Sequence, residues 1–402
     1  MDEEKELTAV FGERLSRARQ RKGMTLNELW RATGGAVSMR ALLDYEHGRR
    51  LPGSKELLVL CRTLGVRPGY LMREGTADMG HIDFRKKNSL RKREERAVII
   101  SAEDAVERYL LAAEISGGRR RFDIGLEEWR VADDEGAIRA AAELRQRWAL
   151  GKDPIANVGS TLEDHGVIVV VMEAPKEFSG MSAVIDDGTP VVVVNKGMTA
   201  ERRRLTVIHE MAHRLLSFGE DIDDKEAERL CSVFANETLI PSDVFKAEIG
   251  ERRLDIAVEE LAGLQKKYGI SIDALMMKAR NNGIISENRY AFYCRKKNWS
   301  EDFKRIVEKT TYEEEHSGAR LSAMVYKALA DGEVSTSKAA ELLDVPIEQL
   351  LRGLTLARDG DSGDRRQHIP RPLEYRLNGR LLPDGVADTH YRFCLSGVVR
   401  AR

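Results

Sequence analysis

Cysteine is scarce in this 402-residue chain, and long apolar runs are missing. Its four cysteines lie far apart and form no C-x-x-C pair, which argues against a cysteine metal cluster and is typical of free thiols in a reducing compartment. No apolar stretch approaches the roughly 20 residues that a membrane helix needs. Residues 1–6 are acidic and polar, unlike the start of a signal peptide. We therefore expect a cytoplasmic protein with no membrane partner.

A large net charge is missing as well, because 65 Lys and Arg face 66 Asp and Glu. The chain as a whole is therefore not a general binder of polyanions. Its charge is uneven, however, since residues 7–74 hold 13 basic and 6 acidic side chains. The length predicts roughly two to four domains.

The most informative motif is His209-Glu210-Met211-Ala212-His213. It lies within residues 201–218, whose apolar periodicity predicts a helix. Residues four apart share one face of a helix, so both imidazoles can reach one metal ion. This is the H-E-x-x-H arrangement of zinc peptidases, in which Glu210 is the general base. A catalytic zinc needs a third protein ligand and one open position for water.

A carboxylate on a following helix, expected at residues 224–239, is the natural third ligand. The candidates are Asp224, Glu226, Glu228 and Glu237. We predict Glu228, because its neighbours Cys231 and Ala235 are small and allow two helices to approach closely. The expected cofactor is Zn²⁺, although Mn²⁺ or Fe²⁺ also accepts His and carboxylate ligands.

Three alternatives accompany this site. The two histidines can be incidental on an ordinary helix, or the metal site can serve structure or sensing rather than proteolysis. Cys231 can be a ligand, although such a cysteine is more often a small buried hydrophobe. For a peptidase, the strand expected at 190–195, or the stretch 181–185 before it, could hold an extended substrate by edge addition.

The N-terminal 75 residues predict several short helices, at 10–24, 26–33, 38–47 and 54–64. Thr25 and Glu28 are spaced for a capping box, and helix, Gly turn and helix is the helix-turn-helix pattern. We predict a small core of Leu29, Ala32, Leu42 and Leu57. The second helix of such a motif enters the major groove by its N-terminal residues. The expected DNA contacts are Asn27, Ser38, Met39, Arg40, Arg49 and Arg50, with Arg40 at a base edge and Asn27 and Ser38 at phosphates.

Two residues of that second helix favour another interpretation. Leu43 and Asp44 stand where polar or basic residues are more usual, and Asp44 would repel phosphate. The module could instead dock onto a protein and touch no DNA.

The fold class predicted is mainly α with a small β-sheet (α+β). Strands are expected at 166–172, 180–185 and 190–195, with a turn at Asp187-Gly188. We divide the chain into a helix-turn-helix domain (1–75), a basic linker and connecting helix (76–134), a metallopeptidase domain (135–300), a C-terminal helical, helix-turn-helix-like region (301–357) and a weakly structured tail (358–402). Residues 318–354 suit a second binding module or a plain helical cap.

These motifs resemble two known families. Segments 25–29 (TLNEL) and 45–52 (YEHGRRLP) look like the XRE-type, lambda-repressor-like helix-turn-helix, with Asn27 in place of the usual Gln. Segments 201–213 (ERRRLTVIHEMAH) and 234–241 (FANETLIP) look like the ImmA/IrrE zinc metallopeptidases. In that family the glutamate six residues before the Phe-Ala pair completes the zinc site, which supports Glu228. Departures are Leu205 for Phe, and Met-Ala for Leu-Gly inside the motif.

The resemblance implies a zincin-like domain that cuts a transcriptional repressor and so induces genes for DNA-damage survival or mobile-element transfer. The expected partners are a protein substrate, an XRE-type repressor, and DNA bound by the helix-turn-helix. A rival hypothesis is a transcription regulator whose peptidase-like domain senses metal or a small ligand. A third places the chain in a toxin–antitoxin or prophage switch. The sequence gives no oligomeric state.

Overall fold

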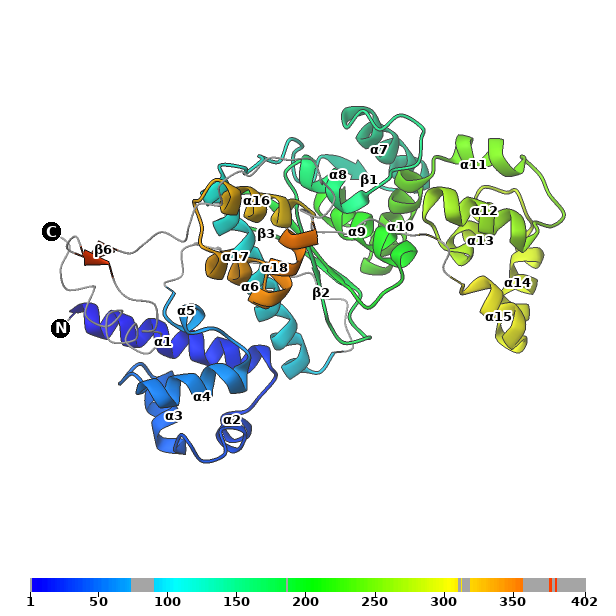
Figure 1. Cartoon of the computed structure of the whole chain (residues 1–402). Helices are drawn as coiled ribbons and strands as arrows, with labels where there is room; N and C mark the ends of the chain where they lie inside the picture. Colours follow the sequence, from blue (N-terminus) through cyan, green and yellow to red (C-terminus); the bar gives the residue numbers. More distant parts are fainter. Residues whose placement is uncertain are drawn as a thin grey trace. The chain divides into compact units, whose positions relative to one another are not determined.

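A computed structural model describes residues 2–73, 90–185, 187–309, 312, 319–356, 376–377 and 380–381 of the chain (Figure 1). It divides into two compact units. One comprises Met1–Ser16, Thr25–Arg73 and Asp344–Arg402, and the other comprises Arg17–Met24 and Glu74–Leu343. The described part is mostly helical with small sheets, which confirms the predicted fold class.

The N-terminal helices are short and are separated by turns. Thr25 accepts a hydrogen bond from the Glu28 amide, and the Glu28 carboxylate accepts one from the Thr25 amide, so the predicted capping box is present. Gly65 ends the fourth helix in the left-handed conformation (φ 66°), which costs a glycine little. The helices are α1 (Asp2–Arg21), α2 (Leu26–Ala32), α3 (Met39–Glu46), α4 (Ser54–Leu64) and α5 (Pro68–Leu71).

Apolar side chains from these helices form a common core. Of the four residues predicted for it, Leu29, Leu42 and Leu57 are buried. Ala32 is exposed, and its neighbour Thr33 is buried instead. The prediction for Ala32 was wrong because α2 ends at this residue, where the helical periodicity no longer applies.

The second unit is built around a three-stranded sheet of order β2-β4-β3. Strand β2 (Ile168–Met172) runs parallel to β4 (Pro190–Asn195), and β3 (Gly180–Val184) runs antiparallel to it. The hairpin turn predicted between β3 and β4 therefore forms, and Gly188 adopts a φ of 83° there. Every residue of β4 is buried, as expected for a central strand that is covered on both faces.

Helices surround this sheet, and two of them are central to the site. Helix α9 (Ala200–Leu215) packs against β3 and β4, and α10 (Asp224–Leu239) packs against α9 and α7 (Figure 1). The remaining helices up to residue 307 are α6 (Lys92–Ser116), α7 (Asp134–Arg147), α8 (Val158–Asp164), α11 (Ser242–Ile249), α12 (Val258–Tyr268), α13 (Ile272–Asn281), α14 (Glu287–Trp299) and α15 (Glu301–Val307). One hydrophobic cluster joins α7 to α15 through the sheet and α9.

A second, smaller sheet pairs segments far apart in the chain. Strand β1 (Trp129–Val131) lies parallel to β5 (Leu216–Phe218), which follows α9 directly. The sequence had extended the helix over these last three residues. The segment 76–134 was predicted as a basic linker and a connecting helix; helix α6 begins at Lys92, so it includes part of the basic stretch.

The C-terminal helices are α16 (Ala319–Ala330), α17 (Thr336–Leu342) and α18 (Ile347–Leu356). The expected weakly structured tail falls on residues of which only β6 (Arg376–Leu377) and β7 (Arg380–Leu381) are described, as an antiparallel pair.

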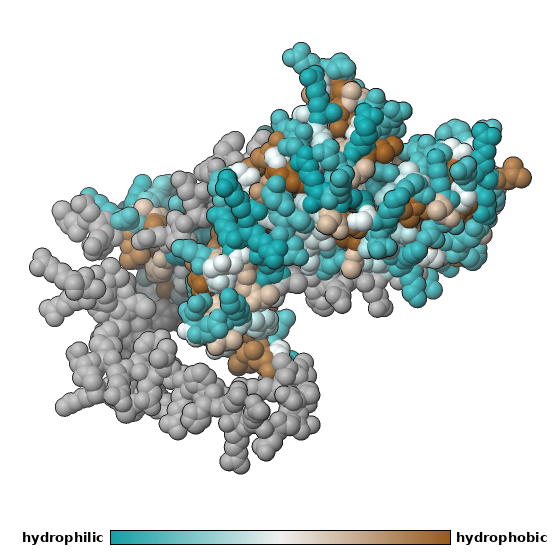
Figure 2. All heavy atoms as spheres, turned by 90° about the horizontal axis from the view of Figure 1, so that it is seen from above, coloured by the Kyte–Doolittle hydropathy of each residue, from teal (hydrophilic) through white to brown (hydrophobic). Residues whose placement is uncertain are grey.

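Among the described helices, none combines the length and apolar character that crossing a membrane requires. One face of the surface is largely hydrophilic, with small separate hydrophobic areas (Figure 2).

Candidate metal centre

Helix α9 presents the H-E-x-x-H motif from a rigid, mostly buried position. Its N-terminus is capped by Thr199, whose hydroxyl accepts from the Arg202 amide. His213 and Glu210 are buried, and the His209 side chain is 15% exposed. The two imidazole rings lie nearly perpendicular, with their centroids 5.0 Å apart. Both histidines thus share one face of the helix, as the four-residue spacing predicted.

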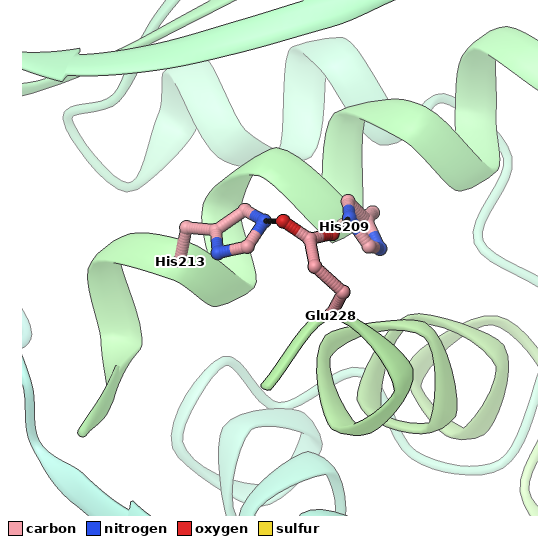
Figure 3. Close-up of side chains that lie close together, drawn as sticks. All are labelled: His209, His213 and Glu228. Carbon is pink, nitrogen blue, oxygen red and sulfur yellow. Dashed lines mark hydrogen bonds and ion pairs between the residues drawn. The ribbon is translucent and has the colours of Figure 1, made fainter. Parts of the chain in front are cut away.

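Glu228 of α10 reaches this pair of rings (Figure 3). Its Oε2 lies 3.1 Å from Nε2 of His209, and its Oε1 lies 3.4 Å from Nε2 of His213. Ligand atoms about 2.0–2.1 Å from a tetrahedral zinc ion lie roughly 3.3 Å apart. One nitrogen from each ring and one carboxylate oxygen lie within 4.8 Å of one another. The donor set and its spacing therefore fit a zinc site with three protein ligands.

The other carboxylates proposed as third ligands are placed elsewhere. Glu226 forms an ion pair with Arg229 at 2.7 Å. Glu237 is buried at the far end of α10 and pairs with Lys278. Asp224 is exposed in the first turn. Among the four candidates, Glu228 is the one that meets both histidines.

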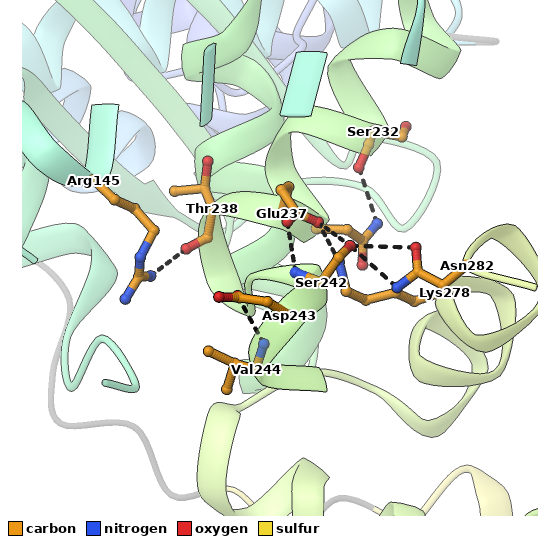
Figure 4. Close-up of polar contacts among 10 residues, drawn as sticks. Arg145, Ser232, Glu237, Thr238, Ser242, Asp243, Val244, Lys278 and Asn282 are labelled. Atoms are coloured by element: carbon orange, nitrogen blue, oxygen red, sulfur yellow. Dashed lines mark hydrogen bonds and ion pairs between the residues drawn. The ribbon is translucent and has the colours of Figure 1, made fainter. Parts of the chain in front are cut away.

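Two buried cations, Lys278 and Arg145, contact the C-terminal end of α10 (Figure 4). Nζ of Lys278 lies 2.6 Å from Oε2 of Glu237, and both side chains are less than 10% exposed. Ser242 adds its amide and hydroxyl hydrogen bonds to the same carboxylate, at 2.6 and 2.7 Å. Burial lowers the pKa of Lys278, although Glu237 opposes this effect. The pair ties α10 to α13.

Arg145 of α7 holds the same end of α10 from another direction. Its guanidinium donates to the carbonyl oxygen of Thr238 at 2.6 Å and to that of Asp153 at 2.7 Å. Burial lowers the pKa of this guanidinium. Cations near the last carbonyls of a helix complement its dipole. Arg145 and Lys278 therefore fix the position of the helix that carries Glu228.

Strand β3 passes close to Glu210. A Cβ at Gly180 would lie 3.0 Å from Cγ of Glu210 and 2.8 Å from Cγ2 of Thr206, so only glycine fits without a shift. In the described sheet β3 pairs with β4 alone, whereas β4 is paired on both sides. Of the two stretches expected to hold a substrate by edge addition, residues 181–185 are thus the ones at a sheet edge.

Two neighbouring residues of α10 contact the outer nitrogens of the histidine rings. Sγ of Cys231 lies 3.5 Å from Nδ1 of His213, and Oγ of Ser232 lies 3.3 Å from Nδ1 of His209. Cys231 was predicted from the sequence as a possible ligand, whereas no role was predicted for Ser232. The signal was available, because positions 228, 231 and 232 lie on one face of a helix.

Two regions of the chain match known protein families. Residues 162–280, which include the whole metal centre, match the IrrE N-terminal-like domain of a peptidase family. Residues 15–71 match a helix-turn-helix family. The chain joins a helix-turn-helix domain to an IrrE-like, metallopeptidase-like domain. A search of curated proteins found no match.

The helix-turn-helix domain implies DNA binding, and five of its six predicted contact residues are exposed: Asn27, Ser38, Arg40, Arg49 and Arg50. Met39, at the start of α3, is half-buried. Ser38 caps α3 by accepting from the Ala41 amide, and its hydroxyl hydrogen can still be donated. Asp44 is paired with Arg49 at 3.2 Å, which reduces the repulsion of phosphate expected from its charge.

Proposed function

We propose that the protein is a zinc-dependent endopeptidase that cleaves a transcriptional repressor of the helix-turn-helix type. Cleavage would induce a DNA-damage or mobile-element response. The observation that carries the proposal is the placement of Glu228 against both Nε2 atoms, at 3.1 and 3.4 Å. The IrrE-like domain implies a protein substrate, and the attached helix-turn-helix suits recognition of a repressor or of the DNA that the repressor occupies.

The chemistry assigns one role to each group. His209, His213 and Glu228 would hold the metal, which when bound would lower the pKa of a water ligand and polarise the scissile carbonyl. Glu210 would accept the water proton and deliver it to the leaving amine. Its low exposure, beside β3, keeps the carboxylate in a site with little bulk water. A substrate strand added to the edge of β3 that has no strand partner in the described sheet would pass next to this carboxylate.

The test compares newly formed protein N-termini in host cells that carry wild-type or Glu210→Gln protein, before and after DNA damage. Glu226→Gln is the matched control, because Glu226 is a carboxylate on α10 that pairs with Arg229 instead of the histidines. We expect a fragment with the wild type and the control that is missing with Glu210→Gln. Its presence with Glu210→Gln would refute the proposed peptidase activity.

A second candidate is a transcription regulator whose IrrE-like domain senses metal or a ligand, including a regulator within a toxin–antitoxin or prophage switch. The match to a helix-turn-helix family over residues 15–71 and the exposed Arg40 favour it. It predicts that Arg40→Ala abolishes promoter binding while Glu210→Gln leaves regulation intact. Normal regulation with Arg40→Ala would eliminate this candidate.

A further inference from the structure

The contacts on the outer side of both histidine rings come from adjacent residues of one helix. Cys231 reaches Nδ1 of His213 and Ser232 reaches Nδ1 of His209, while Glu228 faces both Nε2 atoms. Each ring is therefore held at both nitrogens, with the three contacting residues all on α10. The inference below rests on the proposed metal centre.

Ser232 offers an acceptor to Nδ1 of His209. Its hydroxyl donates to the backbone carbonyl oxygen of Glu228 at 3.0 Å, and a carbonyl oxygen can only accept. A hydroxyl has one hydrogen, so Ser232 must accept at its contact with His209. With a metal ion bound between Nε2 and Glu228, the ring hydrogen of His209 lies on Nδ1 and is donated to Ser232. The Nε2 lone pair is then free to face the ion, as a metal ligand requires.

Cys231 stands in the same relation to His213. Its side chain is fully buried, and its sulfur lies on the Nδ1 side of a ring whose Nε2 is near Glu228. The ring itself separates the thiol from the three converging donor atoms, so Cys231 does not complete the same ligand set. A thiol sulfur is a weak acceptor, and here it can receive the Nδ1 hydrogen of His213.

We propose that Cys231 and Ser232 are positioning residues of the metal centre. They would accept the Nδ1 hydrogen of each ring when the metal is bound and fix the ring planes, so that both Nε2 lone pairs point to the ion that Glu228 also holds. Outer contacts of this kind orient metal-binding histidines, and their loss typically weakens metal affinity roughly 10- to 100-fold. Because sulfur accepts weakly, we expect Cys231→Ala at the lower end of that range and Ser232→Ala nearer the middle.

The first experiment measures the zinc dissociation constant of the full chain by competition with a chromogenic chelator. We expect about a 10-fold weaker affinity for Cys231→Ala, and recovery to within about 3-fold for Cys231→Ser, whose hydroxyl can again accept. Ser232→Ala and Ser232→Thr form the corresponding pair. Cys294→Ala is the matched control, because Cys294 is a free, partly buried thiol on α14.

The second experiment follows the Nδ1 hydrogens with zinc bound. The chain has 8 His, so ¹⁵N-histidine labelling gives few signals, and the two rings of the site are those whose signals shift when zinc is added. We expect slow solvent exchange of the His209 Nδ1 hydrogen in the wild type and faster exchange in Ser232→Ala. The same comparison applies to His213 and Cys231→Ala.

The outcomes separate the two proposals. Wild-type zinc affinity in Cys231→Ala and Ser232→Ala, or equal weakening in the Ala and conservative variants, would overturn the positioning role and leave the metal centre intact. If wild type binds zinc no better than His213→Gln, the metal centre fails and the positioning role fails with it. Weakening by alanine, recovery by the conservative variants and faster exchange of the Nδ1 hydrogens in the alanine variants together would establish it.

Discussion

Breaking the buried ion pair between Glu237 and Lys278 should strongly destabilise the IrrE-like domain. The charged atoms lie 2.6 Å apart and the side chains are 8% and 6% exposed. At an effective dielectric constant of about 20, unit charges at this distance attract by roughly 6 kcal/mol, and burial of the two ions offsets much of this. Lys278→Met leaves the Glu237 carboxylate buried without its counter-charge. We expect it to lower the free energy of unfolding by about 3–5 kcal/mol.

Removing both charges should be far less harmful than removing one. In Glu237→Gln/Lys278→Met the Gln oxygen can still accept from the Ser242 amide, and no uncompensated charge remains. We expect the double variant to lie within about 2 kcal/mol of wild type.

Urea unfolding followed by tryptophan fluorescence measures the free energy of unfolding of the wild type, the two single variants and the double variant. Zinc affinity is the second readout, because α10 carries Glu228. Lys267→Met is the control, since Lys267 pairs with Glu248 at the surface and should cost under about 1 kcal/mol. If the two single losses simply add in the double variant, the reasoning is wrong.

Four further changes test other parts of the molecule. Burial raises the pKa of Glu163 from 4.5 to about 7. Between these two pH values the carboxyl is ionised in the unfolded chain but mostly protonated in the folded protein, so the free energy of unfolding falls as pH rises. Glu163→Gln should therefore stabilise by about 3 kcal/mol at pH 8 and under about 1 kcal/mol at pH 5, measured by urea unfolding. Gly180→Ala should lower peptidase kcat about 10-fold with zinc affinity retained, unlike Gly263→Ala, whose Cβ meets open space. Chelation should lower unfolding free energy by about 2.7 kcal/mol relative to zinc at 100 times its Kd, and Glu228→Gln should abolish that difference. Arg40→Ala should cost about 1–3 kcal/mol in binding to the cognate operator, read by titration.

The features that could be predicted from the sequence are those with a strong local signal. The four-residue spacing of His209 and His213 determined their common face once a helix was expected. The bounds of α10 were predicted as the structure has them, because Asp223 caps its start and Pro241 follows its end. Strand β4 was also predicted correctly, since four consecutive valines lie between Pro190 and Asn195.

The features that were missed depend on contacts between distant segments. Strands β1 and β5 have three residues each and pair across more than eighty positions, so neither carries a periodicity of its own. Helix α6 begins in a run of Lys, Arg and Glu, which are good helix formers, but the charge was interpreted as a solvated linker. The choice of Glu228 followed from small neighbours on α10. The contacts of Cys231 and Ser232 with the rings required the actual distance between two helices.

The arrangement of α10 makes zinc affinity depend on how α9 and α10 pack. Glu228, Cys231 and Ser232 lie within two turns of one helix, so a tilt of α10 would withdraw a ligand and both ring contacts together. The opposite end of the same helix is held by Arg145 and by the Glu237–Lys278 pair. A substitution at that end, more than two helical turns from Glu228, can therefore weaken metal binding without touching a ligand. Conversely, an ion bound between the helices adds its binding free energy to their packing. Zinc affinity and the stability of this helix pair should thus change together across variants of both ends of α10.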